Sequence, residues 1–425
     1  MQVSDVPAAV PAAAPAAKRY YGWVIAWTSF GVLTLAYGVQ YCFGVFLPFI
    51  QEDLGISRKE GTLAFALYVF VYSALSAVSG WLTDRKGPRF VLVIGAFFLG
   101  GGYLLTSRAH TSLQLVLSLG LVAATGMSAA FVPCNATVVR WFLHRRGKAL
   151  SISTSGSSFA TVVNPLVMGG LVDHFGWRTL YVVGAVIVFI ALMVGARLMA
   201  RDPEAKGLSL ADELGGKPPP LAGEGAVETR SLNVRQAAAT VDFWLIVGVF
   251  LFTWLVVFVP LVHLSPYVKD AGASSALGAA LVSVVGVGGL LGRGLSGNAS
   301  DRVGRLLTLT ATLVMQMVAF FTFAATTSLP VLFPAAALFG MGYGGSTVLF
   351  PALAGDRFGR AHAGAIVGAV FASAGSLAAI GPYAAAWIRD STNSYRWAFI
   401  LAAMANGISV LFVAGLHRSG RRAAR

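Results

Sequence analysis

Twelve long apolar stretches, separated by short polar breaks, run along most of the chain. Most reach the roughly 20 residues that an α-helix needs to cross the hydrocarbon core of a bilayer, so the pattern predicts transmembrane helices. The predicted helices span residues 21–47, 60–82, 90–106, 113–141, 149–170, 177–199, 242–268, 275–297, 306–325, 330–354, 363–388 and 395–417. We therefore predict an all-α membrane protein with twelve transmembrane helices.

The polar segments divide these helices into two groups of six. The predicted parts are a disordered N-terminal tail at 1–17, an N-terminal six-helix bundle at 18–199, a cytoplasmic linker at 200–240, a C-terminal six-helix bundle at 241–417 and a basic C-terminal tail at 418–425. The tail at 1–17 is rich in Ala and Pro. The linker contains the run Lys217-Pro218-Pro219-Pro220, which is typical of a flexible connection.

One motif occurs in both halves of the chain. Residues 80–87 and 297–304 both read G-x-x-x-D-R-x-G and are 217 positions apart. Arg140 and Arg357 stand at the same separation. Internal similarity of this kind predicts a duplication that produced two pseudo-symmetric six-helix bundles.

The charges of the two motifs predict a conformational latch. Because a carboxylate accepts hydrogen bonds at a helix N-terminus or pairs with an arginine, we expect Asp84 to pair with Arg140 and Asp301 with Arg357. The alternative is a pair of ordinary turns, whose glycines permit tight geometry and whose charges face water. The residues assigned to the latch are Gly80, Asp84, Arg85, Gly87, Arg89, Arg140, Gly297, Asp301, Arg302, Gly304, Arg305 and Arg357.

Composition and charge support a membrane location. The chain is 56% hydrophobic and 11% charged, which excludes an ordinary soluble domain. A net charge of +14 would also suit a nucleic-acid-binding protein, but the distribution of the cations argues against one. With both termini in the cytoplasm, 23 of the 31 Lys and Arg residues fall on that side, 7 fall outside and Arg293 lies within the membrane. By the positive-inside rule we predict a multi-pass protein of the plasma membrane, as in a bacterial inner membrane, with cytoplasmic termini, lipid contacts and no nucleic-acid partner.

Arg293 is the charged residue predicted at membrane depth. It lies about 12 Å above the turn at 300–302, near the midplane of a hydrocarbon core about 30 Å thick. Ionisable groups at this depth are rare and face a cavity or a partner. No Asp or Glu falls at a comparable depth in another predicted helix, so we expect the partner of Arg293 to be a small organic anion from outside the protein.

The two motif loops resemble the signature of the major facilitator superfamily, and the likeness extends over roughly residues 18–418. This resemblance implies a two-bundle transporter fold. Within that superfamily the chain resembles the monocarboxylate transporter family and the neighbouring oxalate/formate antiporters, and both place a carboxylate-binding arginine where this chain has Arg293. The segments that carry this finer likeness are Tyr20–Trp23, Tyr37–Tyr41, Trp141–Phe142, Arg145–Arg146, Ala149 and Gly156.

The chain departs from both families at charged positions. Animal monocarboxylate transporters have a lysine where we align Tyr41 and an aspartate where we align Gly289, so their proton relay is missing here. Oxalate carriers have a second cation, a lysine, where we align Phe371. One cation suits one carboxylate, because the second charge of a buried dianion would remain unmatched.

Other substrate-binding residues are predicted on several helices. Tyr343 follows Gly340 and Gly342 in a helix that can bend, and its phenol is able to bond a carboxylate, an α-hydroxyl or a keto oxygen. The further candidates are Tyr37, Gln40, Tyr41, Phe131, Asn135 and Phe371. The alternative for all of them is helix packing or an interfacial aromatic position, and three residues within two turns of one helix cannot all face a cavity. His263 is a candidate proton site or gate, because imidazole titrates near neutral pH; the alternative is a hydrogen bond that supports the break at Pro266.

No pattern indicates an enzyme, a metal site or a cofactor. The chain has no metal-ligand spacing, no nucleophile beside a base and no G-x-x-x-x-G-K-[ST] loop. The predicted function is secondary active or facilitative transport of small organic monocarboxylates such as lactate or pyruvate, with or without proton symport, by a monomer. The alternatives are an anion exchanger of the oxalate/formate type, a drug efflux carrier, which would need an acidic residue in its cavity, and a transporter-like sensor, which would need a further soluble segment.

Overall fold

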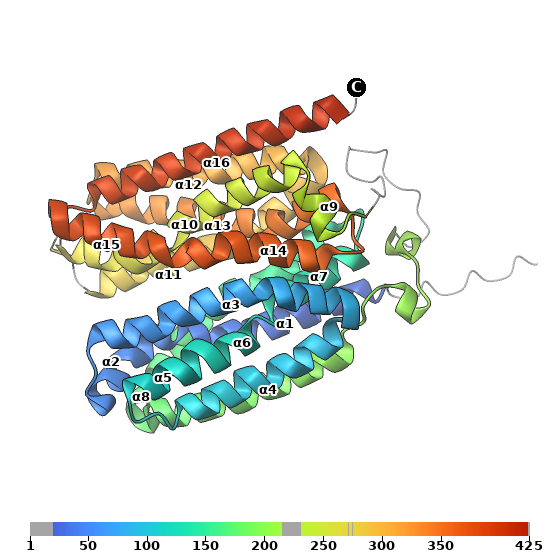
Figure 1. The fold of residues 1–425 in the computed structure, drawn as a ribbon. Coiled ribbons are helices and arrows are strands. Elements are labelled where there is room, and N and C mark those ends of the chain that lie inside the picture. The colour runs from blue at the N-terminus through green and yellow to red at the C-terminus, as the bar shows by residue number, and fades with distance from the viewer. Residues whose placement is uncertain (1–19, 215–230, 271, 274, 424–425) are drawn as a thin grey trace, which may run out of the picture.

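The structure is a computed structural model of the chain and describes residues 20–214, 231–270, 272–273 and 275–423. Helices dominate these ranges, which contain no strand. They lie side by side in two bundles, one coloured blue to green and the other yellow to red in Figure 1. The tail predicted at 1–17 and the proline run at 217–220 lie outside the described residues.

The first bundle contains six spans. Its elements are α1 (Gly22–Tyr41), α2 (Phe43–Leu54), α3 (Arg58–Lys86), α4 (Pro88–Thr106), α5 (Ser112–Leu115), the π-helical η1 (Val116–Ala123), α6 (Ala124–Met127), α7 (Phe131–Trp141) and α8 (Arg146–Leu198). The long α8 combines two predicted helices, which meet at Gly176 with φ 70° and ψ 155°. Glycine adopts this positive φ without the steric cost that a Cβ would bring, so the chain turns there and the second span returns.

The second bundle repeats this arrangement. Its elements are α10 (Val241–Asp270), α11 (Ser275–Val303), α12 (Arg305–Ala325), α13 (Leu329–Phe358), α14 (Ala363–Gly375), η4 (Ser376–Ala379), α15 (Ile380–Thr392) and α16 (Arg396–Ala423). The predicted helix at 363–388 is thus built from three consecutive elements, and the last helix continues beyond the predicted end at 417.

Eleven helical spans in the described ranges are long and apolar enough to cross a membrane. The exception among the twelve predicted helices is 149–170, which is helical as the first part of α8 but is not one of the eleven. Its sequence is rich in hydroxyl side chains between Ser151 and Thr161. These residues pack against other helices, and the prediction of an all-α twelve-helix membrane protein is confirmed at the level of fold.

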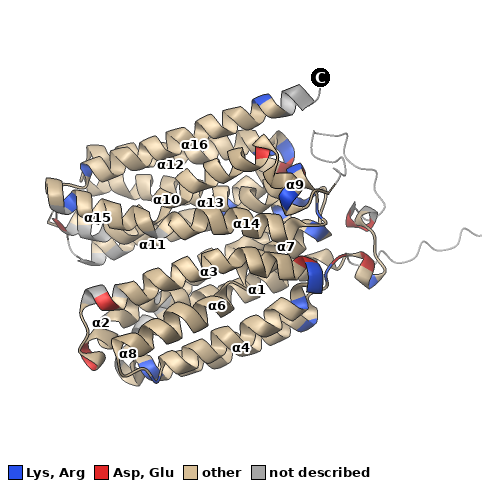
Figure 2. Ribbon diagram, in the orientation of Figure 1, with Lys and Arg blue, Asp and Glu red and all other residues tan. Residues whose placement is uncertain are grey.

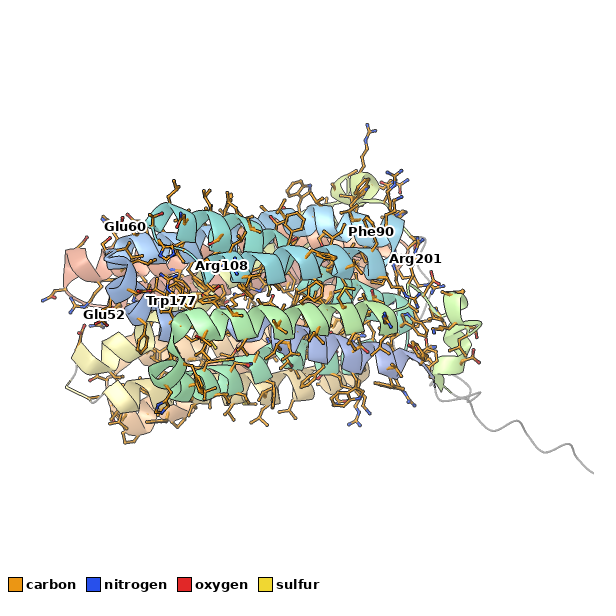
Figure 3. All side chains as sticks on the ribbon, turned by 90° about the horizontal axis from the view of Figure 1, so that it is seen from below. Glu52, Glu60, Phe90, Arg108, Trp177 and Arg201 are labelled. Atoms are coloured by element: carbon orange, nitrogen blue, oxygen red, sulfur yellow. The ribbon has the colours of Figure 1, made fainter. Side chains whose placement is uncertain are left out.

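Charged residues gather at the two ends of the bundles and leave the middle of the helices largely uncharged, as Figure 2 shows. One end is here named the linker end, because α3, α7, α11 and α13 finish there beside the described parts of the linker; the opposite end is the far end. Figure 3 shows Glu52, Glu60 and Trp177 towards the far end and Phe90 and Arg201 towards the linker end.

The bundles meet along two seams, α8 against α11 and α3 against α14. Glycines bring the backbones together in both. A Cβ on Gly80 would overlap the carbonyl oxygen of Gly364, and a Cβ on Gly147 would overlap that of Gly297. Gly80 and Gly297 are the first residues of the two motifs, so the repeated motif closes both seams at the linker end.

The described parts of the linker contact both bundles. The linker forms the short helices η2 (Glu204–Lys206), η3 (Leu210–Leu214) and α9 (Val234–Ala238). The buried Glu213 carboxylate accepts hydrogen bonds from the backbone N–H groups of residues 143, 144 and 145 at 2.8, 3.1 and 2.6 Å. On the other bundle, the N–H of Ala361 donates to Ser231 at 3.2 Å. A freely flexible connection was expected from the sequence, and these stretches differ from it because a carboxylate finds three unpaired donors at one turn.

The close approach at Gly80 gives a first testable prediction. Gly80→Val should push α3 from α14 and open the linker end, because its neighbour is backbone that cannot rotate away. The test uses a background without Cys42 and Cys134, in which Ala363→Cys introduces one thiol at a position where the native side chain is 1% exposed. This thiol should react with a maleimide about tenfold faster when Gly80→Val is also present, since overpacking costs about 1–3 kcal/mol.

Gly101→Val is the matched control, because nothing lies within 4 Å of a Cβ at that position. It should leave the labelling rate unchanged. Equal rates in the two valine variants would contradict the close contact between the seams.

Candidate functional site

Arg293 lies in the middle of α11 and is only 1% exposed. Its Nε and Nη1 atoms have no hydrogen-bond partner, and no acidic side chain among the described residues forms an ion pair with it. The helix ends at Val303, ten residues later, which places Arg293 about 15 Å from the linker end. This depth agrees with the sequence estimate, so a cation with unpaired donors occupies the middle of the protein.

Small residues make room for this guanidinium. Gly289 lies one turn earlier, and a Cβ there would sit 3.7 Å from Nη1 of Arg293 and 3.2 Å from Oγ of Ser158. The hydroxyl of Ser151 donates to the backbone carbonyl of Arg293 at 2.6 Å. Both serines belong to α8, so the arginine sits in the α8–α11 seam between the two bundles.

Tyrosines surround the charged group. The guanidinium carbon lies 5.4 Å from the ring centroid of Tyr343, a cation–π contact from α13. Tyr37 and Tyr41 of α1 stack on each other at 5.7 Å and interact electrostatically with Arg293. Tyr72 of α3 interacts in the same way with Tyr343. Phenols from the first bundle therefore converge with Arg293 and Tyr343 from the second.

Gln40 lies with these phenols. It is 5% exposed, its amide contacts Tyr72, and its Oε1 has no hydrogen-bond partner. The structure thus brings Tyr37, Gln40 and Tyr41 to one face of α1. The expectation that they cannot all point the same way is wrong, because positions i, i+3 and i+4 are neighbours on the surface of an α-helix.

Asn135 is arranged differently. Its Nδ2 donates to the carbonyl of Phe131 at 2.9 Å and its Oδ1 accepts from Ser153 at 3.0 Å, and the side chain is fully buried. These bonds join α7 to α8 within one bundle. Phe131 lies 5.2 Å from Phe371, centroid to centroid, so those two rings contact each other across the two bundles.

His263 lies near the far end of α10. Its Nε2 is 2.9 Å from the carbonyl of Pro382, and its ring is 5.3 Å from that of Tyr395. Both partners belong to the second bundle. The histidine is therefore bonded within one bundle and apart from the residues gathered around Arg293.

The Asp84–Arg140 ion pair expected from the motif is present, and both side chains are buried. Asp84 also accepts hydrogen bonds from the backbone N–H groups of Gly364 and Ala365 at 3.0 and 2.6 Å. These are the first residues of α14, where the positive end of the helix dipole favours an anion. Asp84 of one bundle thus caps a helix of the other.

Asp301 has the equivalent position in the second bundle. It accepts hydrogen bonds from the N–H groups of Gly147 and Lys148 at 3.0 and 2.9 Å, at the start of α8. The expected pair of Asp301 with Arg357 is wrong, however. Asp301 pairs with Arg305, four residues later, whereas Arg357 pairs with Asp242 at 2.9 Å. The pseudo-symmetry is broken because Arg305, the first residue of the adjoining helix α12, lies next to the Asp301 carboxylate.

The remaining motif residues have separate roles at the linker end. Gly87 and Gly304 have φ values of 84° and 98°, so both turns need glycine. Arg89 donates to the carbonyl of Met199 at 2.6 Å. Arg85 lies over the ring of Trp81 at 4.9 Å, and Arg302 is exposed.

Sequence reasoning missed an ion network between the bundles. Arg146 is 3% exposed, pairs with Asp356 and donates to the carbonyl of Phe142 at 3.1 Å. Asp356 also pairs with Arg305 at 3.0 Å, which links this group to Asp301. These residues have no counterpart in the other repeat, so a search for repeated charges does not find them. Among the described ion pairs, those that join the bundles lie at the linker end.

Sequence reasoning also missed two aromatic residues that contact Phe371, namely Tyr72 and Trp254. Tyr72 lies one turn from Ser76 on the face of α3 that meets α14, and Trp254 packs against Phe371 at 4.7 Å. The signal available was the position of large aromatic residues at mid-helix on inter-bundle helices. Such residues are too common in membrane helices to stand out in a single sequence.

Comparison with known proteins supports the two-bundle fold. The family model for the Major Facilitator Superfamily matches residues 29–382 and, in a second match, 299–424. Monocarboxylate transporter 11 of Mus musculus is 32% identical over 66% of this chain and 60% of that protein. Monocarboxylate transporter 13 of Bos taurus is 28% identical over 90% of this chain and 86% of that protein. The structure of the proton:xylose symporter XylE is similar with a TM-score of 0.73 and 15% identity, covering 94% of this chain and 96% of that one.

The observed pairing of Asp301 gives a second prediction. In thermal unfolding of the detergent-solubilised protein, Asp301→Asn and Arg305→Gln should be non-additive by about 1 kcal/mol, because the two groups are in contact. Asp301→Asn and Arg357→Gln should be additive within a few tenths of a kcal/mol. A coupling that is larger for Asp301 with Arg357 would contradict the arrangement described here.

Proposed function

The chain belongs to the major facilitator superfamily, whose members are transporters rather than enzymes, and we propose that it carries small organic monocarboxylates across the plasma membrane by alternating access. The observation that carries this proposal is Arg293, buried at mid-depth with unpaired nitrogen donors. A carboxylate offers two oxygens in the geometry that the planar guanidinium recognises. The similarity to proteins named monocarboxylate transporters supports the same substrate class.

The phenols would complete the binding site. With the carboxylate on Arg293, the hydroxyl groups of Tyr343, Tyr37 and Tyr41 would bond an oxygen on the neighbouring carbon of lactate or pyruvate, a role that their proximity to Arg293 supports. Gln40 offers an unpaired oxygen beside them. Asn135 is a less suitable ligand than its sequence position suggested, because Phe131 and Ser153 occupy its polar atoms.

Substrate binding would promote the conformational change. A buried cation without a counter-ion resists the loss of water around it, whereas a neutral carboxylate–guanidinium pair does not. A bound anion would therefore lower the cost of moving between the state closed at the linker end and the state open there. Ser151 donates to the Arg293 backbone in the same seam that must part, so the occupied site and the moving interface share residues.

The linker end would face the cytoplasm. The basic residues of the linker, the motif turns and α16 concentrate there, which the positive-inside rule assigns to the cytoplasm. Asp84 and Asp301 would then act as cytoplasmic latches, each released from the opposite bundle during transport. Uptake measured with and without an imposed pH gradient distinguishes proton symport from exchange and from uniport.

The third prediction concerns Arg293. Arg293→Gln and Arg293→Lys should each lower the uptake of labelled lactate and pyruvate into proteoliposomes by about 100-fold, because removing one partner of a buried charge pair costs about 3 kcal/mol, and lysine lacks the bidentate fork. Both variants should remain folded in thermal unfolding.

Arg108→Gln is the matched control, since Arg108 is an exposed arginine that is not one of the latch residues. Its uptake should stay at the wild-type level. Near-normal transport of a monocarboxylate by Arg293→Gln would refute the assigned substrate class.

The fourth prediction concerns the valence of the substrate. Oxalate should compete poorly with labelled lactate, because Arg293 neutralises one carboxylate only. Phe371→Lys should improve oxalate competition and weaken lactate uptake, because the new cation lies on the other seam and would face the second carboxylate. Strong inhibition by oxalate in the wild type would show that a second positive charge reaches the site.

A further inference from the structure

The interface between the bundles contains two unlike groups of side chains, here called walls. One wall is the charged and phenolic group described above, centred on Arg293 in the α8–α11 seam. The other is an aromatic cluster in and beside the α3–α14 seam, formed by Tyr72, Phe131, Trp254, Phe350 and Phe371. We infer that the aromatic cluster selects the body of the substrate, so that the preferred monocarboxylates bear an aromatic ring rather than only a methyl group.

Phe371 lies at the centre of the cluster. Its ring centroid is 4.7 Å from that of Trp254 and 5.2 Å from that of Phe131. Tyr72 lies 6.2 Å away, and Trp254 also packs against Phe350 at 5.2 Å. Tyr72 and Phe131 belong to the first bundle and the other three to the second, so these rings meet at the surface that parts during transport.

The cluster lies at the same depth as Arg293. Counting from the linker ends of their helices, Phe371 is eight residues along α14, Phe131 ten residues from the end of α7 and Trp254 thirteen residues along α10. At about 1.5 Å per residue these rings lie about 12–20 Å from the linker end, against about 15 Å for Arg293. The two walls thus belong to one layer across the middle of the protein.

Tyr72 connects the two walls. Its ring packs against Phe371 at 6.2 Å, and it lies near Tyr343, whose ring faces the Arg293 guanidinium at 5.4 Å. An acid held by its carboxylate on Arg293 therefore directs its other end towards the α3–α14 seam. A methyl group on that side offers the aromatic wall little surface, whereas an added ring offers a face and an edge for stacking.

The chemistry of the second wall favours a ring over a polar group. Aromatic pairs in offset or edge-to-face arrangements gain free energy beyond the burial of their area, and Trp254 makes edge-to-face contacts with Phe350 and Phe371. A ring on the substrate can replace one of these contacts when the bundles part. A polar substituent placed there would be desolvated, and the five side chains offer it only the Tyr72 hydroxyl and the Trp254 indole N–H.

This inference rests on the proposed function, and its test compares two acids that differ only in the ring. Labelled lactate and labelled 3-phenyllactate carry the same carboxylate and α-hydroxyl. In proteoliposomes, unlabelled 3-phenyllactate should inhibit the uptake of labelled lactate at a concentration at least about tenfold lower than unlabelled lactate does. This is the factor expected when a ring is both buried and stacked.

The variants assign this preference to the cluster. Trp254→Leu should reduce the preference for 3-phenyllactate by about threefold or more while lactate uptake changes little, and Trp254→Phe should retain most of the preference because it keeps a ring. Trp244→Leu is the matched control, since Trp244 lies on the same helix and is 60% exposed on its outer side; it should leave the preference unchanged.

Each outcome bears on one of the two proposals. Equal competition by the two acids in the wild type overturns the aromatic preference and leaves monocarboxylate transport standing. Equal loss of both acids in Trp254→Leu overturns it too, because the tryptophan would then only support the fold. Failure of both acids to bind or cross in the wild type overturns the proposed function itself.

Discussion

A guanidinium at the middle of a membrane protein is costly unless something neutralises it, and Arg293 places this constraint on the whole molecule. The residue is buried, and two of its nitrogens have no partner. The surroundings leave room for the guanidinium at the interface between the bundles. Gly289 leaves space beside it, serines of α8 face it from the opposite bundle, and Tyr343 offers the face of its ring. Aromatic and hydroxyl groups can stabilise a cation only in part. In the function proposed above, a carboxylate from outside completes the pairing.

The linker end carries the hydrogen bonds and ion pairs that hold the two bundles together. Asp84 and Asp301 each cap the first turn of a helix that belongs to the opposite bundle. Opening that end must therefore remove charge-assisted hydrogen bonds from two helix N-termini, and the Arg146–Asp356–Arg305 network adds to this closure on one seam only. Glu213 attaches the linker to the turn at 143–145 beside the same seam. The structure is thus a state closed at the linker end, and the charged site around Arg293 lies at mid-depth between the two bundles.

Much of this was predictable because membrane insertion and duplication leave strong patterns. Twelve apolar stretches, the repeated G-x-x-x-D-R-x-G motif and the single mid-membrane arginine gave the fold, the two bundles, the Asp84–Arg140 pair and the central cation. The partner of Asp301 was not predictable from the repeat, because Arg305 has no equivalent in the first half, where Pro88 stands. The docking of Glu213 depends on where the linker returns in space. Likewise, a sequence shows Tyr72 and Trp254 as ordinary aromatics, and only the packing of α3 against α14 shows that they meet.

The most direct measurement is calorimetric binding of a carboxylate and its uncharged amide to the purified wild-type protein, for example lactate against lactamide. The two ligands have nearly the same size and the same α-hydroxyl, but only one carries the charge that Arg293 would bind. If the anion neutralises Arg293, lactate binds and lactamide shows no measurable binding over the same concentration range, because a neutral ligand leaves the buried cation unpaired. Equal binding of acid and amide would contradict the central role of Arg293.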